Sequence, residues 1–323
     1  MSYPVVSVLI PAYNAGRWVA QSIQSVLTQD WPKTEIIIVD DGSRDATLAV
    51  ARRFESKQVK VVTQENQGAA AARNRALSLA QGDYIQWLDA DDLLAPDKIS
   101  KQLEEENTAP SILLSSTFGR FFSRPENAVF SPTLLWQDLL PVDWITTKFA
   151  NNLWMNPAVW LVSRELTEVA GPWNEALSLD DDGEYFCRVV AASSIVKFVP
   201  GAKSYYRQWS VGSLSRTSSE KACRSLLSSL KLSIGYLLSL EDSQRTRNVA
   251  LSYLQAWIHY FYPEKENLLE ELNVLAAELG GRLQPPTLKP KYKLICRLFG
   301  WQSAKRAMGA VAATKLWTRR CWD

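Results

Sequence analysis

The sequence has 323 residues, of which 46% are hydrophobic and 22% are charged, enough for one large globular core or two modest ones. This balance excludes intrinsic disorder, collagen and coiled coil. A single histidine excludes His-rich metal sites and most His-based triads, and four scattered cysteines without a CxxC pair exclude zinc fingers and a disulfide framework. Any catalysis is therefore expected to use carboxylates, hydroxyls, backbone groups or a hard metal ion.

Charge is unevenly distributed, although the net charge is only +2. Residues 285–323 contain nine lysines and arginines against one acid, so this tail carries +8 and the rest of the chain −6. The N-terminus lacks the features of a signal peptide, and no segment has the roughly 18–20 consecutive apolar residues that a membrane helix needs. We therefore expect a cytoplasmic protein with reduced thiols.

The first ninety residues alternate strand and helix patterns. Four apolar runs predict strands, at 5–10, 35–39, 59–63 and 83–88. Helical stretches are predicted between them, at 19–27, from 43 to about 54, and at 69–80. Strands buried on both faces and joined by helices predict an α/β protein with a Rossmann-like, mostly parallel sheet.

Beyond this region the pattern changes twice. Residues 110–210 are irregular, with short strands and many aromatic residues, and the chain reads as helical from about 219 onward. A proline-rich hinge at 285–290 then precedes the basic tail.

Polar side chains gather where the predicted strands end, at 11–14, 40–43 and 89–92. Ligands of parallel sheets bind at the carboxyl ends of the strands. Asp89 and Asp91 there would form a hard oxygen site for Mg²⁺ or Mn²⁺ shared with substrate phosphates. The alternative is that Asp91 and Asp92 simply cap the next helix. Likewise Asp41 either accepts hydrogen bonds from a nucleotide or belongs to a turn that caps the helix following it.

Two further groups have the chemistry to contact a nucleotide. Tyr13, in the string Pro11-Ala12-Tyr13-Asn14, could stack on a base, and Arg73 or Arg75 could contact phosphate. A plain turn and solvated arginines are the alternatives.

Four strings occur together in order: SVLIPAYN (7–14), IIIVDDGSRD (36–45), NQGAAAARNRAL (66–77) and GDYIQWLDADD (82–92). This order and spacing resembles the family-2 glycosyltransferases, which have the GT-A fold. The resemblance implies a nucleotide-sugar donor, most often a UDP-sugar, a divalent cation and inversion at the anomeric carbon. It also implies that Asp41 contacts the base, Asp91 holds the metal and Asp89 lies towards the sugar or ribose, with Pro11, Tyr13, Asn14 and Arg73 at the donor.

An inverting transfer also requires a base that deprotonates the acceptor hydroxyl. The string Leu179-Asp180-Asp181-Asp182-Gly183-Glu184 resembles the family's acidic string at a helix start, and counting back from Arg188 selects Asp182 as the base. Asp181 then stands where relatives often carry Glu, and Trp173 and Asn174 are expected to border the acceptor. A solvated helix start is the alternative.

The chain departs from the family in two places. Many relatives carry a histidine shortly after a Tyr-Arg pair, whereas Tyr206-Arg207-Gln208 leads here to Trp209. Arg207, Ser213 or Ser215 could replace its contact. The QxxRW string of processive synthases is absent, so one sugar is expected to be added per encounter.

The tail mixes its cations with leucines and tryptophans, a composition that suits an anionic membrane surface, with a solvated helical cap as the alternative. No nucleic-acid-binding signature accompanies it. Tryptophans of the middle segment are expected mainly in the core, with an acceptor groove as the alternative.

These predictions combine into one hypothesis. Residues 1–215 form a GT-A domain, with a nucleotide-sugar half at about 1–95 and an acceptor half at about 96–215, and residues 216–323 form a helical region ending in the tail 285–323. The enzyme would add a sugar to a glycan or lipid-linked acceptor in polysaccharide or glycolipid synthesis. It is expected in the cytoplasm, where the tail would let it associate with the inner face of the cytoplasmic membrane. A sugar nucleotidyltransferase and a non-catalytic carbohydrate- or membrane-binding module are the alternatives.

Overall fold

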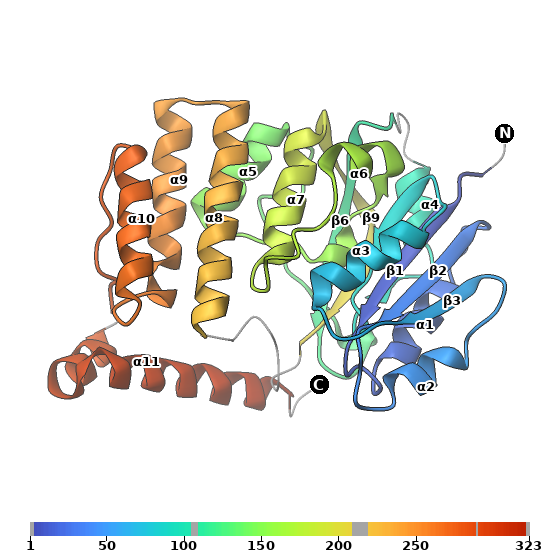
Figure 1. Cartoon of the computed structure of the whole chain (residues 1–323), viewed down its shortest axis with the longest axis horizontal. Coiled ribbons are helices and arrows are strands. Elements are labelled where there is room, and N and C mark those ends of the chain that lie inside the picture. The colour runs from blue at the N-terminus through green and yellow to red at the C-terminus, as the bar shows by residue number, and fades with distance from the viewer. Residues whose placement is uncertain (1–2, 105–108, 209–218, 289, 321–323) are drawn as a thin grey trace.

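The computed structural model describes residues 3–104, 109–208, 219–288 and 290–320. Its first sheet lies at the N-terminal end of the molecule (Figure 1). In spatial order its strands are β3 (Val59–Thr63), β2 (Thr34–Asp40), β1 (Val6–Ala12), β4 (Tyr84–Trp87) and β8 (Val162–Ser163). The first four are parallel and only β8 is antiparallel. The predicted parallel sheet and its four strands are thus confirmed.

The strands of this sheet are apolar on both faces because helices cover both sides. Leu9, Ile37 and Val39 point into one core together with alanines of α3 (Ala69–Leu79). Their chain neighbours Val8 and Ile38 point into a second core, built against α1 (Val19–Leu27) and α2 (Thr47–Arg52). Side chains alternate across a strand, so near-continuous apolar runs are what a sheet buried on both faces requires.

A second sheet follows from the irregular middle of the chain. Its strands, in spatial order, are β5 (Leu93–Leu94), β9 (Ile195–Arg207), β6 (Ile112–Phe121) and β7 (Val129–Phe130). β5 begins one residue after the Asp89–Asp92 turn and pairs with the end of β9, at Tyr205 and Ser204. This pairing brings the last residues of β9 to the acidic turn.

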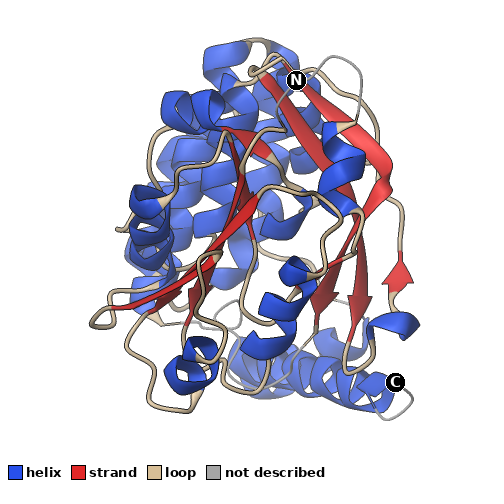
Figure 2. Cartoon of the chain, turned by 90° about the vertical axis from the view of Figure 1, so that its right-hand side faces the viewer, coloured by secondary structure: helices blue, strands red, loops and turns tan. Residues whose placement is uncertain are grey.

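The remaining helices surround the sheets and extend the molecule on one side (Figures 1 and 2). They are α4 (Lys98–Leu103), α5 (Pro141–Asn151), α6 (Arg164–Ala170), α7 (Asp181–Ala192), α8 (Glu220–Leu240), α9 (Gln244–Trp257), α10 (Glu266–Glu278) and α11 (Pro290–Arg320), with 3₁₀ turns η1 (Pro125–Asn127), η2 (Pro157–Val159) and η4 (Ile258–Tyr260). α8, α9 and α10 stand side by side, and α11, interrupted at Gly300 with φ 78°, runs across one end of the molecule. The predicted helical C-terminal region is confirmed.

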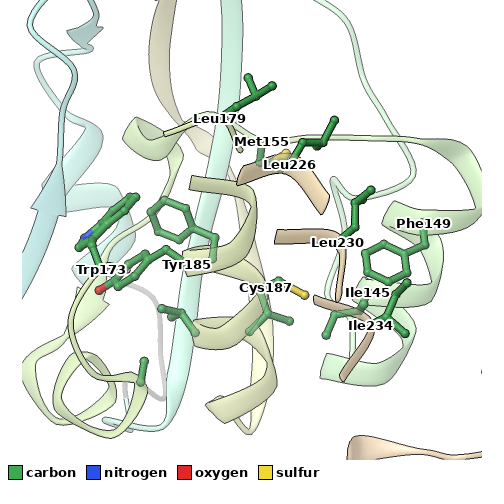
Figure 3. Close-up of a cluster of buried hydrophobic side chains, with 14 of the residues drawn as sticks. Ile145, Phe149, Met155, Trp173, Leu179, Tyr185, Cys187, Leu226, Leu230 and Ile234 are labelled. Carbon is green, nitrogen blue, oxygen red and sulfur yellow. The ribbon is translucent and has the colours of Figure 1, made fainter. Parts of the chain in front are cut away.

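One continuous apolar core joins α7 to the C-terminal helices. Cys187 on α7 lies in this core with Leu230 and Ile234 of α8 and Phe149 of α5 (Figure 3). The same core includes Trp87 at the end of β4. Because α7 shares this core with β4 and with α8, its start is held between the first sheet and α8.

The predicted division at 215/216 falls outside the described residues and remains a prediction.

Candidate active site

Loops at the carboxyl ends of β1 and β2 are hydrogen-bonded to one another. The Asp41 amide donates to the Ala12 carbonyl at 2.8 Å, and the Arg44 amide donates to Asn14 Oδ1 at 2.8 Å. The Asn14 amide in turn donates to Ser43 Oγ at 2.9 Å. The Pro-Ala-Tyr-Asn and Asp-Asp-Gly-Ser strings are thus two sides of one structure, as expected for adjacent parallel strands.

Asp41 holds the loop that precedes α3. Its carboxylate is buried and accepts four hydrogen bonds, of 2.8 to 3.1 Å, from Gln64 Nε2, Asn66 Nδ2 and the amides of Gln67 and Gly68. Both oxygens are therefore engaged within the chain. Asp41 therefore does stabilise the start of a helix, as the alternative prediction has it. That helix is α3, however, and not α2, which follows Asp41 directly in sequence.

The other residues predicted at the donor lie on the open side of these loops. Tyr13 is 48% exposed, Asn14 is exposed with a left-handed φ of 50°, and Pro11 is half-buried at the end of β1. A tyrosine ring standing free of the core is available to stack on a planar ligand.

The acidic turn after β4 is held by the last residue of β9. The Arg207 amide donates to Asp92 Oδ1 at 2.8 Å, and Arg207 Nε donates to the Asp91 carbonyl at 2.8 Å. The guanidinium lies 4.1 Å from the ring centre of Trp18 and 4.4 Å from that of Phe121. Arg207 was expected as a possible substitute for the family's histidine; here it fixes the turn. Ser213 and Ser215 lie outside the described residues.

Arg73 connects this turn to the start of α7. Its side chain is buried, and its two terminal nitrogens donate to Asp89 Oδ1 and to Asp181 Oδ2, each at 2.8 Å. Burial opposes a charged guanidinium, but these carboxylates and Asp182 raise the pKa of Arg73 above its usual value. Residues 89 and 181, far apart in sequence, thus belong to one site.

The three aspartates at the start of α7 have different partners. Asp180 binds Ser229 of α8, with 2.6 Å between Ser229 Oγ and Asp180 Oδ2, and Asp181 binds Arg73. Among the described residues, the only hydrogen bond donated to the Asp182 carboxylate comes from the adjacent Gly183 amide, at 2.9 Å. Of the three carboxylates, that of Asp182 is thus the one without a side-chain hydrogen-bond partner in the described part of the chain.

Burial and neighbouring acids raise the pKa of both carboxylates assigned a chemical role. Burial raises the pKa of Asp182 to about 7, with Asp181 and Asp180 adding to the rise and Arg73 opposing it. Burial, followed by the charge of Asp89, raises the pKa of Asp91 to about 6. A carboxylate with a pKa near neutrality is suited to take up a proton during turnover.

Trp173 lies deeper than expected for a residue bordering an acceptor. The side chain is 2% exposed, stacks on Tyr185 with ring centres 4.0 Å apart, and lies under the Arg73 guanidinium at 4.3 Å (Figure 3). Its indole therefore supports Arg73 and does not line the surface. Asn174 is half-buried, and its side-chain oxygen accepts a hydrogen bond from the Ala176 amide at 3.1 Å.

Sequence reasoning did not single out Asn74 or Tyr206. Asn74 holds Trp173 by its backbone, accepting from the Trp173 amide at 2.8 Å and donating to its carbonyl at 2.9 Å. Tyr206 lies near the acidic site, where burial and the charges of Asp92 and Asp91 raise its pKa. The only signal for Asn74 was its place beside Arg73 in the string 66–77.

No cluster of three or more His, Cys, Asp or Glu side chains in the described part of the chain is arranged to enclose a metal ion. Asp91 nevertheless offers a hard oxygen donor whose raised pKa reflects a poorly neutralised charge, which a cation would relieve. Mg²⁺ is commonly held by one or two carboxylates together with substrate phosphates and water. The residues therefore fit a metal completed by the substrate better than a metal held by protein alone.

Residues 7–145 match the sequence model of glycosyl transferase family 2. The chain contains a family-2 glycosyltransferase domain. The predicted family is thereby confirmed. The match includes the loops of Tyr13 and Asp41 and the Asp89–Asp92 turn, whereas Asp181 and Asp182 lie beyond it.

A curated relative supports the same family. The putative teichuronic acid biosynthesis glycosyltransferase TuaG of Bacillus subtilis is 47% identical over 104 residues, which are 31% of this chain and 41% of TuaG. The chain spans about two-fifths of the length of the first curated relatives that it matches, 42% and 41%.

Solved structures support the predicted fold. S. aureus TarS 1–349, solved in complex with UDP-GlcNAc, superposes with a TM-score of 0.68 at 16% identity, covering 84% of this chain and 81% of that one. The mannosyltransferase PcManGT of Pyrobaculum calidifontis, in complex with GDP-Man and Mn²⁺, gives 0.57 at 18% identity, covering 99% and 84%. The family-2 domain here has the GT-A fold, as predicted. No helix in the described ranges is long and apolar enough to cross a membrane.

Proposed function

We propose that this family-2 glycosyltransferase moves a sugar from a nucleoside-diphosphate sugar to an acceptor hydroxyl in the synthesis of a polysaccharide or another cell-surface glycan. The observation that carries the proposal is the Arg73 bridge, which joins Asp89 at the strand ends to Asp181 at the start of α7. Donor-side and acceptor-side carboxylates thus belong to one site, as a direct transfer between two substrates requires.

The nucleotide is proposed to bind over the loops at the ends of β1 and β2. Tyr13, exposed beside Asn14, would stack on the base, and Asp41 would shape the site through the loop at 64–68 that it holds. A UDP-sugar is the first candidate donor; TarS was solved with UDP-GlcNAc and PcManGT with GDP-Man.

A divalent cation is proposed to be held by Asp91 together with oxygens of the donor. When bound, Mg²⁺ or Mn²⁺ would neutralise charge on the diphosphate leaving group. Asp89, fixed by Arg73 at 2.8 Å, would lie towards the sugar or ribose. Arg207 would keep Asp91 in place through its hydrogen bond to the Asp91 carbonyl.

Asp182 is proposed as the base that takes the proton of the acceptor hydroxyl while that oxygen attacks the anomeric carbon. The attack on the face opposite the diphosphate forms the new glycosidic bond and breaks the bond to the leaving group, which inverts the configuration. Asp181 cannot take this role while its carboxylate binds Arg73, and Asp180 is bound to Ser229.

The proposed function predicts which nucleotide product is released. In a screen of UDP- and GDP-sugars with Mg²⁺ or Mn²⁺, we expect one donor class to raise the Tm of the protein, and the same donor to yield a nucleoside diphosphate during turnover. The Tm shift is measured by thermal unfolding, and the product by chromatography. Release of pyrophosphate would point instead to a sugar nucleotidyltransferase, and neither stabilisation nor release with any donor would contradict the proposal.

The basic tail is proposed to bring the enzyme to an anionic membrane surface, where a lipid-linked acceptor would be found. Leu294, Leu298 and Phe299, at the start of α11, are 62%, 64% and 71% exposed, and Lys293 directly precedes Leu294 and Arg297 directly precedes Leu298 in sequence. Two other side chains of α11, those of Tyr292 and Ala304, are buried and anchor the helix to the rest of the molecule. Exposed apolar side chains with neighbouring cations match the interface of an anionic bilayer.

Replacing Leu298 and Phe299 with serine should release the protein from vesicles containing anionic phospholipid. Flotation of the full chain with anionic and neutral vesicles measures this, and wild-type binding should weaken as salt rises because the cations contribute. Val274→Ser is the matched control, since Val274 is 59% exposed on α10. If the double variant binds as well as wild type, or wild type binds neutral vesicles equally, the tail does not act in this way.

A further inference from the structure

Two serines of α8 contact the segment that leads into α7. Ser225 Oγ accepts hydrogen bonds from the amides of Ser178 and Leu179, at 2.8 and 3.0 Å, and donates to the Leu179 carbonyl at 2.9 Å. Ser229 Oγ lies 2.6 Å from Asp180 Oδ2 and 3.1 Å from the Asp180 carbonyl. Both serines are buried, so these hydroxyls have no access to bulk water in place of the loop.

The segment needs such support because Asp180 has a left-handed backbone. Its φ is 62°, a conformation that aspartate tolerates but that remains sparsely populated without surrounding contacts. Asp180 immediately precedes the first turn of α7, so its conformation sets the direction in which that turn begins.

Gly183 leaves the room that the Asp180 carboxylate occupies. A Cβ atom at position 183 would lie only 2.1 Å from Asp180 Oδ1. The carboxylate therefore folds back over the first turn of α7 while Ser229 holds its other oxygen. This arrangement accounts for the glycine after three aspartates, which the sequence alone left unexplained.

Opposing effects act on the charge of the Asp180 carboxyl group. Burial raises the pKa of Asp180, and Asp181 and Glu184 add to the rise, whereas the charge of Lys148 and the hydrogen bond from Ser229 oppose it. Lys148 of α5 is itself buried and lies 3.2 Å from the Tyr253 hydroxyl. The 2.6 Å contact with the buried Ser229 hydroxyl is therefore one of the interactions that keep this carboxyl group in its place.

The first turn of α7 is thus held from both sides. Arg73 of α3 holds Asp181, Ser229 of α8 holds Asp180, and Asp182 follows these two aspartates directly in sequence. Apolar packing of α7 against Leu226 and Leu230 of α8 sets the distance between the helices but does not select the backbone conformation of a polar loop (Figure 3).

We infer that Ser225 and Ser229 are positioning residues for sugar transfer, which fix the left-handed Asp180 and so aim the Asp182 carboxylate at the acceptor. This inference rests on the proposed function. It gives α8, which lies after the residues that match the family-2 model, a role in positioning the proposed base in addition to its packing in the core.

The test compares kcat with substrate binding in the full chain. Ser229→Ala should lower kcat about 10- to 100-fold, the loss expected when a reacting group is misplaced by about 1 Å. Donor KM, and donor affinity by calorimetry, should stay within about twofold, because the donor-side contacts of Asp41 and Asp89 are untouched. Ser228→Ala is the matched control, since Ser228 is half-buried and its hydroxyl, within the described ranges, donates to the Arg224 carbonyl of its own helix.

Gly183→Ala gives a second test that does not depend on removing a buried hydroxyl. The new methyl group would push the Asp180 carboxylate away from Ser229, which costs stability, while alanine favours the helix itself, so kcat should fall in a protein that still folds. If a folded Ser229→Ala variant or the Gly183→Ala variant keeps the wild-type kcat, the positioning role is overturned. The role is also overturned if donor affinity and kcat fall by the same factor. Absence of transfer by the wild-type chain would instead count against the proposed function.

Discussion

Asp182→Asn is expected to abolish sugar transfer and leave donor binding nearly unchanged. The amide has the shape of the carboxylate but cannot accept the proton of the acceptor hydroxyl, and loss of general-base catalysis typically costs about 10²- to 10⁴-fold in rate. Donor affinity should stay within about twofold, because the hydrogen bond found for the Asp182 carboxylate in the described part of the chain comes from Gly183 and not from the proposed nucleotide loops. Turnover assays and calorimetric titration of the donor measure the two quantities.

Asp97→Asn serves as the control for this variant. Asp97 is a half-exposed aspartate paired with Lys101, outside the site, and its substitution should leave turnover unaltered. Wild-type turnover by Asp182→Asn would remove Asp182 from the mechanism, and the same loss in Asp97→Asn would indicate a general effect on folding.

The pKa of Asp182 gives the same prediction a pH dependence. Because burial and the neighbouring acids raise this pKa to about 7, the carboxylate is protonated and inactive as a base below that value. We expect kcat to rise as pH passes through about 7 and then level off. A raised pKa in the folded protein also means that stability is lost as pH rises through 7, so Asp182→Asn should have a Tm at pH 8 no lower than wild type.

The sheet and its polar edge were predictable because their causes are local or repetitive. Apolar runs predict strands, helices between them require parallel order, and parallel order places the ends of β1, β2 and β4 at one edge. Asp41 and Asp89 could be assigned to that edge without knowing any contact. The partners of Asp41 follow it by 23 to 27 residues and lie in the next loop of the same sheet.

The support of the site could not be predicted in this way. Asn74 meets Trp173 across 99 residues and Ser229 meets Asp180 across 49, and neither contact leaves a period or spacing in the sequence. A serine in a helix reads as an ordinary surface or capping residue until its neighbour is known. The burial of Trp173 beneath Arg73 could not be predicted either, because a tryptophan is common both in a core and on a sugar-binding surface.

Asp91→Ala is expected to remove the dependence of donor binding on a divalent cation. In wild type, Mn²⁺ should strengthen donor binding at least about tenfold, or roughly 1.4 kcal/mol, because the cation binds both the Asp91 carboxylate and the diphosphate. In the variant, affinity should be weak and the same with Mn²⁺ or with chelator, as measured by calorimetry. Turnover should fall accordingly, since the leaving diphosphate is no longer neutralised.

A second substitution separates metal binding from damage to the turn. Asp138→Ala removes an acid whose carboxylate, among the residues that the structure describes, accepts a hydrogen bond from the Phe198 amide of β9, and this variant should keep the full effect of Mn²⁺. The Asp89–Asp92 turn should survive in Asp91→Ala, since Arg207 binds the Asp91 backbone and the Asp92 carboxylate and not the Asp91 side chain. If Mn²⁺ still strengthens donor binding in Asp91→Ala, another group holds the cation, and the metal site must be sought away from this carboxylate.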